Sequence, residues 1–422
     1  MTSRPRVVLG VGGGIAAYKA CEVLRRLTES GHDVRVVPTE AALRFVGAAT
    51  FEALSGNKVH TGVFSDVPEV PHVRLGQEAD IVVVVPSTAD LLAKAAHGLA
   101  DDLLTNTLLT ARCPVLMVPA MHTEMWEHAA TQANVATLRS RGVVVSEPAS
   151  GRLTGADTGK GRLADPAEIV DLARLLMARS DALPRDMEGL HVVVSAGGTR
   201  EPLDPVRFLG NRSSGKQGYA LARTAVQRGA RVTLVSAHTA ALPEPAGAEI
   251  INAGTAAELR DAVHKAAADA DVVVMAAAVA DFRPTHRAEF KIKKTEADPD
   301  AVALTRNADV LAELVENRRR EPGSGQVASQ VIVGFAAETG DNGSDVLDHA
   351  RAKLARKGCD LLVVNRVGEG KAFETEDNEG WLLSADGTER AIAFGSKAQV
   401  ASEVWDAVVS TISRSRRDTP PG

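Results

Sequence analysis

The segment PAMHTEMW, residues 119–126, places one histidine between two methionines, directly after the apolar run VLMV. Such a run is typical of a buried strand, so the segment should mark the turn from a strand into a helix. His122 and the thioethers of Met121 and Met125 are a poor ligand set for a metal ion. A plain helix start, capped by Thr123, and the wall of a cofactor pocket are the remaining interpretations.

A glycine-rich stretch, GVGGGIAAYKA at 10–20, follows another predicted strand and opens a predicted helix. Its glycines let the backbone approach a phosphate, and the helix N-terminus offers free N–H groups and the positive end of the dipole. Ile15 stands where GxGxxG needs its last glycine, and the second strand ends in VVPT without a ribose-binding carboxylate. These departures argue against NAD and favour a mononucleotide such as FMN. A tight turn without a ligand is the alternative.

A second loop, GNRSSGKQ at 210–217, nearly matches the phosphate-loop pattern GxxxxGK[ST]. Gln217 takes the place of the hydroxyl that binds Mg²⁺, and the loop begins about a dozen residues after its strand, so we exclude an ordinary P-loop NTPase. Residues 211–215 still form an anion cradle ahead of a predicted helix over 216–228. A serine N-cap without a ligand is the alternative.

Three lysines lie in KIKK, residues 291–294, inside the long charged segment 284–300. The segment can bury little, which predicts a mobile loop. On a lid facing the anion cradle, the lysines could close over a triphosphate and its leaving group. An equally weighted alternative is that these lysines only form a charged surface in contact with water.

The elements that must position these loops occur twice along the chain. Each copy has a strand, a Gly-rich turn and a helix, then a second strand that follows a glycine, and then a third strand that follows an Asp. The first copy covers 6–20, 31–39 and 79–92, and the second covers 191–204, 229–239 and 270–282. Continuous Val/Ile runs between helical patterns predict parallel sheets covered on both faces. We therefore predict an α/β fold with two tandem, doubly wound Rossmann-like domains, whose ligands bind at the carboxyl ends of the strands.

The polar segment SDALPRDMEG, 180–189, separates the two halves. The predicted domains are 1–183 and 190–412, and the polar residues 413–422 are predicted to be a disordered tail.

Composition excludes several classes of protein. The net charge of −6 argues against a nucleic-acid binder, and the longest apolar runs, such as IVVVV at 81–85, are too short to span a membrane. The N-terminus carries no secretory signal pattern. Three widely spaced cysteines, Cys21, Cys113 and Cys359, form no disulfide framework, which predicts a cytoplasmic protein.

A set of short motifs, taken in order, is similar to one enzyme family. The motifs are GGGIAAYKA, VVPSTADL, PAMHTEMW, SAGGTREPLDPVRFLGNRSSGKQG, AAAVADF, KIKK, VGFAAET and ARAKLARKGCDLLVVN. Each is weak alone. The ordered set, from about residue 6 to about residue 410, resembles the bifunctional phosphopantothenoylcysteine decarboxylase / phosphopantothenate–cysteine ligase of coenzyme A biosynthesis.

The resemblance implies an FMN-dependent, flavoprotein-type decarboxylase half followed by a CTP-dependent ligase half, with Mg²⁺ accompanying CTP. The ligase would join 4′-phosphopantothenate to L-cysteine through an acyl-cytidylate and release CMP and diphosphate, because a free carboxylate is a poor electrophile. The decarboxylase would then convert 4′-phosphopantothenoylcysteine to 4′-phosphopantetheine, with FMN as a transient electron acceptor.

The resemblance also assigns residues of the first half. His72, at the start of a predicted helix, matches the family's catalytic histidine, although a lone histidine is more often structural. The implied flavin contacts are Gly14, Ile15, Thr39, Ser87, Thr88 and Asp90, with Met121 and Met125 against the ring system or beside it.

In the second half, Asn211 matches the family's asparagine at the acyl-cytidylate and Lys291 its triphosphate lysine. Lys353 and Lys357 would share one face of a helix, which suits two cations that hold one polyanion. The implied CTP contacts are Met275, Ala276, Ala277, Asp281, Lys291, Ala308, Asp309, Val310, Leu311, Phe335, Lys353 and Lys357. The Mg²⁺ ligands are not assigned.

Two positions depart from the family's pattern. His122 stands where the motif PxMNxxMW has an asparagine that recognises the substrate carboxylate. Gly155 stands where a flap cysteine protonates the enethiolate, so Asp157, His122, water or another group must supply that proton. An impaired decarboxylase is the less favoured alternative, because the rest of the site is intact.

The family further implies a homo-oligomer, with trimers of decarboxylase halves and dimers of ligase halves combining into a dodecamer, so that His72 serves a neighbour's flavin. Two other classes compete with this interpretation. A regulatory protein that only binds a flavin or nucleotide leaves KIKK and Asn211 unexplained, and a dehydrogenase lacks its ribose carboxylate.

Overall fold

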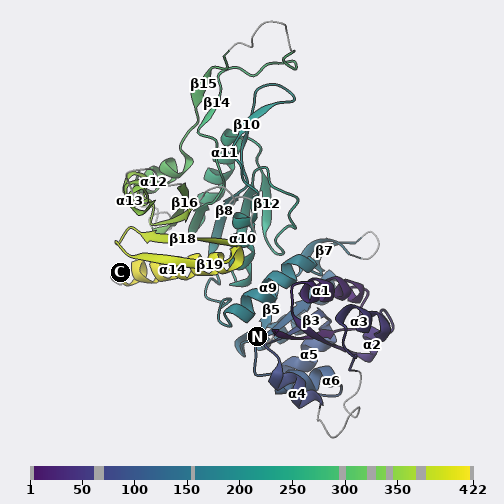
Figure 1. The fold of residues 1–422 in the computed structure, drawn as a ribbon. Helices are drawn as coiled ribbons and strands as arrows, with labels where there is room; N and C mark the ends of the chain where they lie inside the picture. The colour runs from purple at the N-terminus through teal and green to yellow at the C-terminus, as the bar shows by residue number, and fades with distance from the viewer. Residues whose placement is uncertain are drawn as a thin grey trace. The chain divides into compact units, whose positions relative to one another are not determined.

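The computed structural model describes residues 4–60, 71–153, 157–293, 301–320, 329–338, 346–366 and 377–418. It divides into two compact units, Met1–Pro184 with Pro245–Gly247, and Arg185–Glu244 with Ala248–Gly422 (Figure 1). Among the described residues, no helix combines the length and the apolar character needed to cross a membrane.

The first unit is built on a fully parallel sheet in the order β2-β1-β3-β4-β5. The strands are β1 Arg6–Val11, β2 Asp33–Pro38, β3 Ile81–Ser87, β4 Val115–Pro119 and β5 Val144–Val145. Every residue of β3 is buried, because a parallel strand with helices on both faces has no solvent side.

Helices cover this sheet. On one side α1 Ala17–Glu29 packs with α3 Ala48–Ser55 and α9 Pro166–Ala178. Apolar residues of α5 Ala89–His97, α6 Leu103–Thr110 and α8 Ala129–Ser140 form a core with Val8, Val82 and Val84 of the sheet. The shorter elements are α2 Glu40–Leu43, α4 Pro71–Glu78, α7 Thr123–Glu127 and the hairpin of β6 Ala149–Arg152 and β7 Thr158–Arg162.

The second unit has a larger sheet, ordered β12-β11-β8-β13-β16-β17-β18-β19. The strands are β8 His191–Ala196, β11 Arg231–Ser236, β12 Glu249–Asn252, β13 Val272–Met275, β16 Val331–Glu338, β17 Leu361–Arg366, β18 Asp377–Ser384 and β19 Glu389–Ser396. One core joins α10 Lys216–Gln227 and α14 Lys397–Asp418 to the sheet. The opposite core holds α11 Ala256–Ala267, α12 Val310–Arg320 and α13 Val346–Lys357. The predicted class of two doubly wound α/β domains is confirmed.

The last two strands of this sheet differ from the prediction of a parallel sheet, since β18 runs antiparallel to both β17 and β19. A short turn joins β18 to β19, with Gly387 at φ 88° and the Thr388 N–H bound by the Asp386 carboxylate. Such a turn can connect only antiparallel neighbours, because a parallel return needs a crossover. Two small ribbons, β9 Arg200–Pro202 with β10 Phe208–Gly210 and β14 Phe282–Pro284 with β15 Leu304–Arg306, complete the unit.

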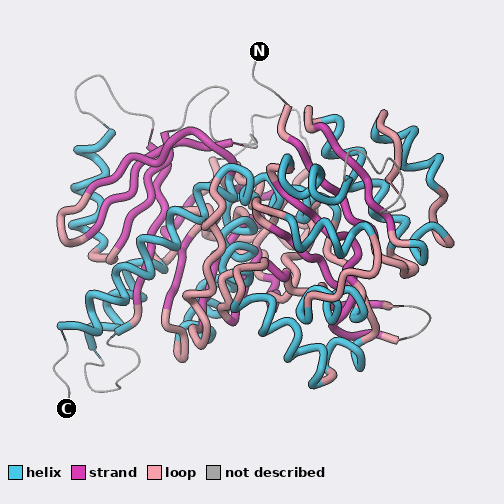
Figure 2. Tube along the Cα trace, turned by 90° about the horizontal axis from the view of Figure 1, so that it is seen from below, coloured by secondary structure: helices cyan, strands magenta, loops and turns pink. Residues whose placement is uncertain are grey.

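The prediction of a disordered tail over 413–422 is wrong for its first part, because α14 continues to Asp418 and residues 419–422 lie outside the described range. This long helix precedes the chain end marked C in Figure 2. Its buried Trp405 donates its indole N–H to the Leu221 carbonyl at 3.0 Å, and Arg414 pairs with Asp386. The polar sequence of the last turns therefore continues a helix that is fixed by its earlier, apolar residues.

A buried cation ties α14 to the beginning of the second unit. The Arg228 side chain, 1% exposed, donates to Asp186 at 2.9 and 2.5 Å, to Asp406 of α14 at 2.7 Å and to the Ser402 carbonyl at 3.2 Å. The two carboxylates and the carbonyl offset the cost of burying the guanidinium.

We expect Arg228→Ala to lower the free energy of unfolding by roughly 3 kcal/mol, because it leaves two carboxylates without their shared cation. The matched control is Arg231→Ala, whose side chain is 61% exposed and pairs with Asp269 at 2.9 Å. That change should cost less than about 1 kcal/mol. Denaturant unfolding of both variants measures the two losses in unfolding free energy. Equal losses would show that the buried ion pairs of Arg228 stabilise the protein no more than the exposed pair of Arg231.

Candidate active sites

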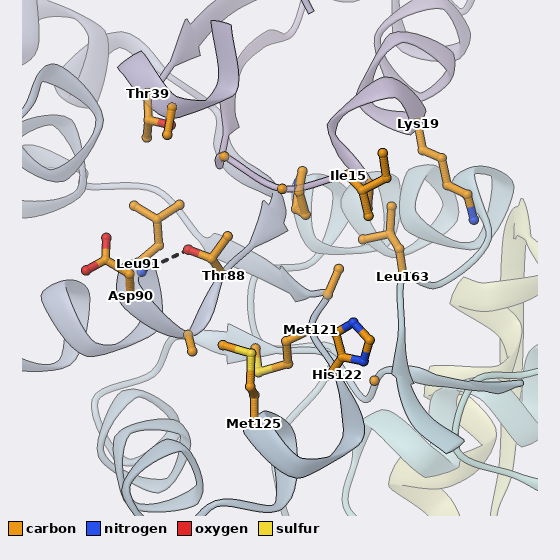
Figure 3. A pocket seen from close by; sticks show the side chains of 18 of the residues that line it. Ile15, Lys19, Thr39, Thr88, Asp90, Leu91, Met121, His122, Met125 and Leu163 are labelled. Carbon is orange, nitrogen blue, oxygen red and sulfur yellow. Dashed lines mark hydrogen bonds between the residues drawn. The ribbon is translucent and has the colours of Figure 1, made fainter. Parts of the chain in front are cut away.

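The first cavity lies at the carboxyl ends of β1, β3 and β4 and measures about 1490 Å³ (Figure 3). It brings together predicted residues that are far apart in the sequence: Gly14, Ile15, Thr39, Thr88, Asp90, Met121, His122 and Met125. Figure 3 shows the side chains of Ile15, Thr88 and His122 reaching the same space from three separate loops.

The glycines that precede α1 have two different tasks. A Cβ on Gly12 would lie 2.4 Å from the Pro86 carbonyl oxygen, and one on Gly13 would lie 2.3 Å from the Ala41 Cβ. A Cβ on Gly14 would meet only the Thr88 Cγ2, at 3.9 Å. Close packing therefore requires the earlier glycines, and only Gly14 leaves its space open to a ligand.

The helix that follows this loop begins without a side-chain cap. The Ala16 position makes no capping hydrogen bond, and the Ala17 N–H donates to the Gly14 carbonyl at 2.9 Å. The first N–H groups of a helix have no intrahelical acceptor, so an uncapped start suits an anion.

Two threonines at the cavity cap the neighbouring helices. The Thr39 Oγ1 accepts from the Ala42 N–H at 3.1 Å, and the Thr88 Oγ1 accepts from the Leu91 N–H at 3.2 Å. A hydroxyl that accepts in this way still has its own proton to donate to a ligand. Ser87, by contrast, is fully buried and donates to the Val84 carbonyl at 3.0 Å, so the structure does not place it in the cavity wall.

The segment 119–126 closes β4 and begins α7 at Thr123. The residue at the N-cap is His122 and not Thr123, and its imidazole makes no capping hydrogen bond. Trp126 anchors the short helix in the core at 3% exposure, which leaves Met121 and His122 at the cavity (Figure 3).

The β6–β7 hairpin packs directly on this segment. The Met121 N–H donates to the Gly161 carbonyl at 2.9 Å, and a Cβ on Gly161 would lie 2.3 Å from the Met121 carbonyl oxygen. Gly161 has φ 144°, so a glycine is required there for both reasons. The hairpin therefore fixes the wall that carries His122.

Five cations at the cavity are not among the predicted contacts: Lys19, Arg44, Lys94, Arg152 and Arg162. Burial and the neighbouring Arg162 lower the pKa of the Lys19 ammonium. Lys19 follows the glycine loop by about one helical turn, and this spacing is the signal that could have found it. Asp90 is 71% exposed and pairs with Lys94 at 3.3 Å.

Two other predicted residues do not line this cavity. His72 lies in the first turn of α4, where its carbonyl accepts from the Thr110 hydroxyl at 2.7 Å and its buried Nδ1 finds no partner among the described residues. Asp157 is exposed just before β7. Gly155 lies outside the described residues.

The second cavity, about 990 Å³, belongs to the second unit. Predicted residues that line it are Asn211, Met275, Ala276, Ala277, Asp281, Ala308, Asp309, Val310, Leu311, Phe335, Lys353 and Lys357. Lys291 is exposed in the segment after β14 and does not line it, and Lys294 lies outside the described residues.

The stretch predicted as an anion cradle leads into the start of α10. Its N-cap is Gly215, at φ 78°, where a Cβ would lie 2.5 Å from the Thr239 Cγ2 and where no side chain caps the helix. The alternative of a serine N-cap is therefore wrong. The Asn211 amide, at the same end, donates to the Val279 carbonyl at 3.1 Å.

The opposite wall of this cavity holds two linked charges. Lys357, in the last turn of α13, forms an ion pair with Asp309, whose other carboxylate oxygen accepts from the Ala312 N–H at 3.1 Å. Burial alone would raise the pKa of Asp309, but the Lys357 ammonium and the Ala312 N–H together lower it. Asp309 therefore stays ionised at neutral pH and fixes the position of Lys357.

Among the residues that the structure describes, metal ligands do not gather at either cavity. Within the described ranges, no group of three or more His, Cys, Asp or Glu side chains has a metal-binding arrangement.

Comparison with known proteins divides the chain near the same place as the structure does. Residues 1–177 match the family model "Flavoprotein", and residues 187–412 match "DNA/pantothenate metabolism flavoprotein C-terminal domain". The coenzyme A biosynthesis bifunctional protein CoaBC of Mycolicibacterium smegmatis is 66% identical over 97% of this chain and 98% of its own length. The CoaBC protein of Bacillus subtilis is 41% identical over 97% of this chain and 98% of its own length. A solved PPC decarboxylase mutant, complexed with pantothenoylaminoethenethiol, is 30% identical over 42% of this chain and all of its own, with a TM-score of 0.38.

The fold and the matched models define a two-domain enzyme with a flavoprotein half and a ligase half. The chain belongs to the family of bifunctional coenzyme A biosynthesis proteins called CoaBC.

The two kinds of glycine in the first loop give opposite predictions. Gly13→Ala should destabilise the first unit by about 1–3 kcal/mol, because the new methyl group meets Ala41. Gly14→Ala should leave stability nearly unchanged but reduce the flavin that copurifies with the protein, because its methyl group occupies the ligand's space. Denaturant unfolding and visible absorbance separate the effects, and full flavin content in a stable Gly14→Ala protein would contradict this assignment.

Proposed function

We propose that the first cavity binds FMN and decarboxylates 4′-phosphopantothenoylcysteine, and that the second uses CTP to join 4′-phosphopantothenate to L-cysteine. The observation that carries this proposal is that each half gathers most of its predicted contacts around one cavity, at the carboxyl edge of its own sheet. Three free cysteines without disulfide spacing support a cytoplasmic location.

The residues of the first cavity fit FMN. The open face of Gly14, the uncapped start of α1 and the hydroxyl protons of Thr39 and Thr88 suit a single phosphate. Met121, Met125 and Ile15 offer an apolar wall for a flat ring system. FMN, when bound, supplies the electron sink that the substrate lacks.

His122 would orient the substrate for this chemistry. It stands at the cavity on a wall fixed by the β6–β7 hairpin, and an imidazole N–H can donate to the substrate carboxylate as an asparagine amide does. It is also our favoured proton source over the exposed Asp157, because it already lines the cavity. His72 would act at a neighbouring subunit, which agrees with its place outside the cavity of its own chain.

The second cavity would hold CTP with its phosphates at the start of α10. That helix offers free N–H groups and Phe335 offers a face for stacking, while the opposite wall offers the Lys357–Asp309 pair for polar contacts. Asn211 would hold the acyl-cytidylate, and Lys291 would close over the phosphates. Asp281, a carboxylate at the cavity, would hold Mg²⁺, which would supply positive charge to the phosphates.

Exposed apolar side chains on the small ribbons support pairing of the ligase halves. Phe208, Phe282 and Leu304 are 49%, 46% and 48% exposed on β10, β14 and β15. Large apolar residues gathered on one projection mark an interaction surface. We propose dimers through these ribbons and trimers of the first unit, which together give a dodecamer.

The purified protein should be yellow and, with phosphopantothenate, cysteine and Mg²⁺, should release diphosphate from CTP but not from ATP. Asn211→Ala should lower that rate about a hundredfold or more, because a donor to the acyl-cytidylate is lost. The same variant should decarboxylate 4′-phosphopantothenoylcysteine at the wild-type rate, which serves as the control for folding. A colourless protein that is indifferent to CTP would refute the proposal.

In the decarboxylase assay, His122→Asn should restore the family's amide and keep carboxylate recognition, whereas His122→Ala should raise KM about tenfold or more. Asp157→Asn should keep the wild-type rate of CO₂ release, since Asp157 does not line the cavity. A large loss in Asp157→Asn would make Asp157, and not His122, the proton donor.

A further inference from the structure

The β6–β7 hairpin forms one wall of the first cavity, yet its strands bury almost no apolar surface. Arg152 of β6 and both Gly161 and Arg162 of β7 line the cavity. Within the two strands only Gly161 is buried, and a glycine has no side chain to pack. Burial of apolar side chains in the strands therefore contributes little to holding this wall, and polar contacts must hold it instead.

Glu147 lies between β5 and β6 and binds two cations. Its side chain, 14% exposed, accepts from the Arg139 guanidinium of α8 at 2.7 Å, and its other oxygen lies 2.7 Å from the Lys160 ammonium of β7. Arg139 also donates to the Val145 carbonyl of β5 at 2.8 Å. Burial alone would raise the pKa of Glu147, but Arg139 and Lys160 together lower it. The ionised carboxylate thus links the hairpin to α8 and, through Arg139, to the parallel sheet.

Lys160 carries this link to α7. Its ammonium lies 5.9 Å from the centre of the Trp126 ring, within the range of a cation–π interaction. The preceding residue packs on the same helix, since a Cβ on Gly159 would lie 2.3 Å from the Thr123 Oγ1. The following residue, Gly161, accepts its hydrogen bond from the turn that leads into α7. Three consecutive residues of β7 therefore contact the segment that closes β4 and begins α7.

We propose that Glu147 is a positioning residue for decarboxylation: through Lys160 it holds the β6–β7 hairpin against α7 and so keeps His122 in place at the first cavity. This inference rests on the proposed decarboxylase function. Glu147 does not line the cavity itself, so it acts through the hairpin. A hairpin that is in place for a smaller fraction of the time leaves fewer molecules ready to bind substrate, and the apparent affinity falls in proportion.

The test measures decarboxylation of 4′-phosphopantothenoylcysteine by the full-length protein. Glu147→Gln should raise KM about tenfold, because a charged hydrogen bond is lost, while kcat stays within about twofold. Lys160→Met should have a similar effect. The double variant should be no worse than either single variant, because all three break the same link. Lys160→Arg keeps the charge and should stay close to the wild type.

The matched control is Glu29→Gln, which makes the same chemical change at an exposed ion pair of the first unit. Glu29 is 68% exposed, lies 3.8 Å from Arg25 and does not line the cavity, so neither KM nor kcat should change. Flavin absorbance reports whether the first unit is intact in each variant. Lys160 is 38% exposed, so its variants test the link even where Glu147→Gln lowers stability.

An unchanged KM in Glu147→Gln would exclude the positioning role. Effects that multiply in the double variant would show that Glu147 and Lys160 do not act through their ion pair. A loss of bound flavin in Lys160→Met, together with a fall in kcat, would make the pair a support of the whole unit and not of the hairpin. A wild-type protein that releases no CO₂ would instead refute the proposed decarboxylase function.

Discussion

Both cavities depend on one constraint: a parallel strand can be followed by a parallel neighbour only through a crossover on the face of the sheet. Every strand-to-helix turn of the parallel region therefore falls at the same edge. The start of α1, the caps of α2 and α5, and the turn into α7 meet there in the first unit. The starts of α10 and α12 meet in the second. Segments far apart in sequence become one site without any specific attraction between them.

Sequence reasoning can find what this constraint dictates. Buried Val/Ile runs fix which residues are strands, so the loops after β1, β3 and β4 can be assigned to one edge from the pattern of residues alone. Thr39, Thr88 and His122 line one cavity for this reason. Ser87 does not line it, because a strand alternates its side chains between two faces and this last residue points away.

Other features are beyond sequence reasoning because they depend on packing between distant segments. The glycine run looks like one phosphate-binding unit, yet Gly12 and Gly13 are required by Pro86 and Ala41, which no local pattern connects to them. Likewise, the hydrophilic end of α14 looks disordered until Trp405 and Arg228 fix the helix.

The starts of α1 and α10 are left open, whereas α2, α5 and α6, which also begin at the first cavity, are capped by Thr39, Thr88 and Asp102. α11, whose start lines neither cavity, has a full capping box at Thr255, which satisfies its own N–H groups. α1 and α10 begin at the cavities and have no side-chain cap. An uncapped start costs about 1 kcal/mol, and a bound anion can return that stabilisation only while it is present. Ligand binding should therefore raise the stability of each unit, because a bound phosphate would accept hydrogen bonds from the N–H groups that no side chain caps.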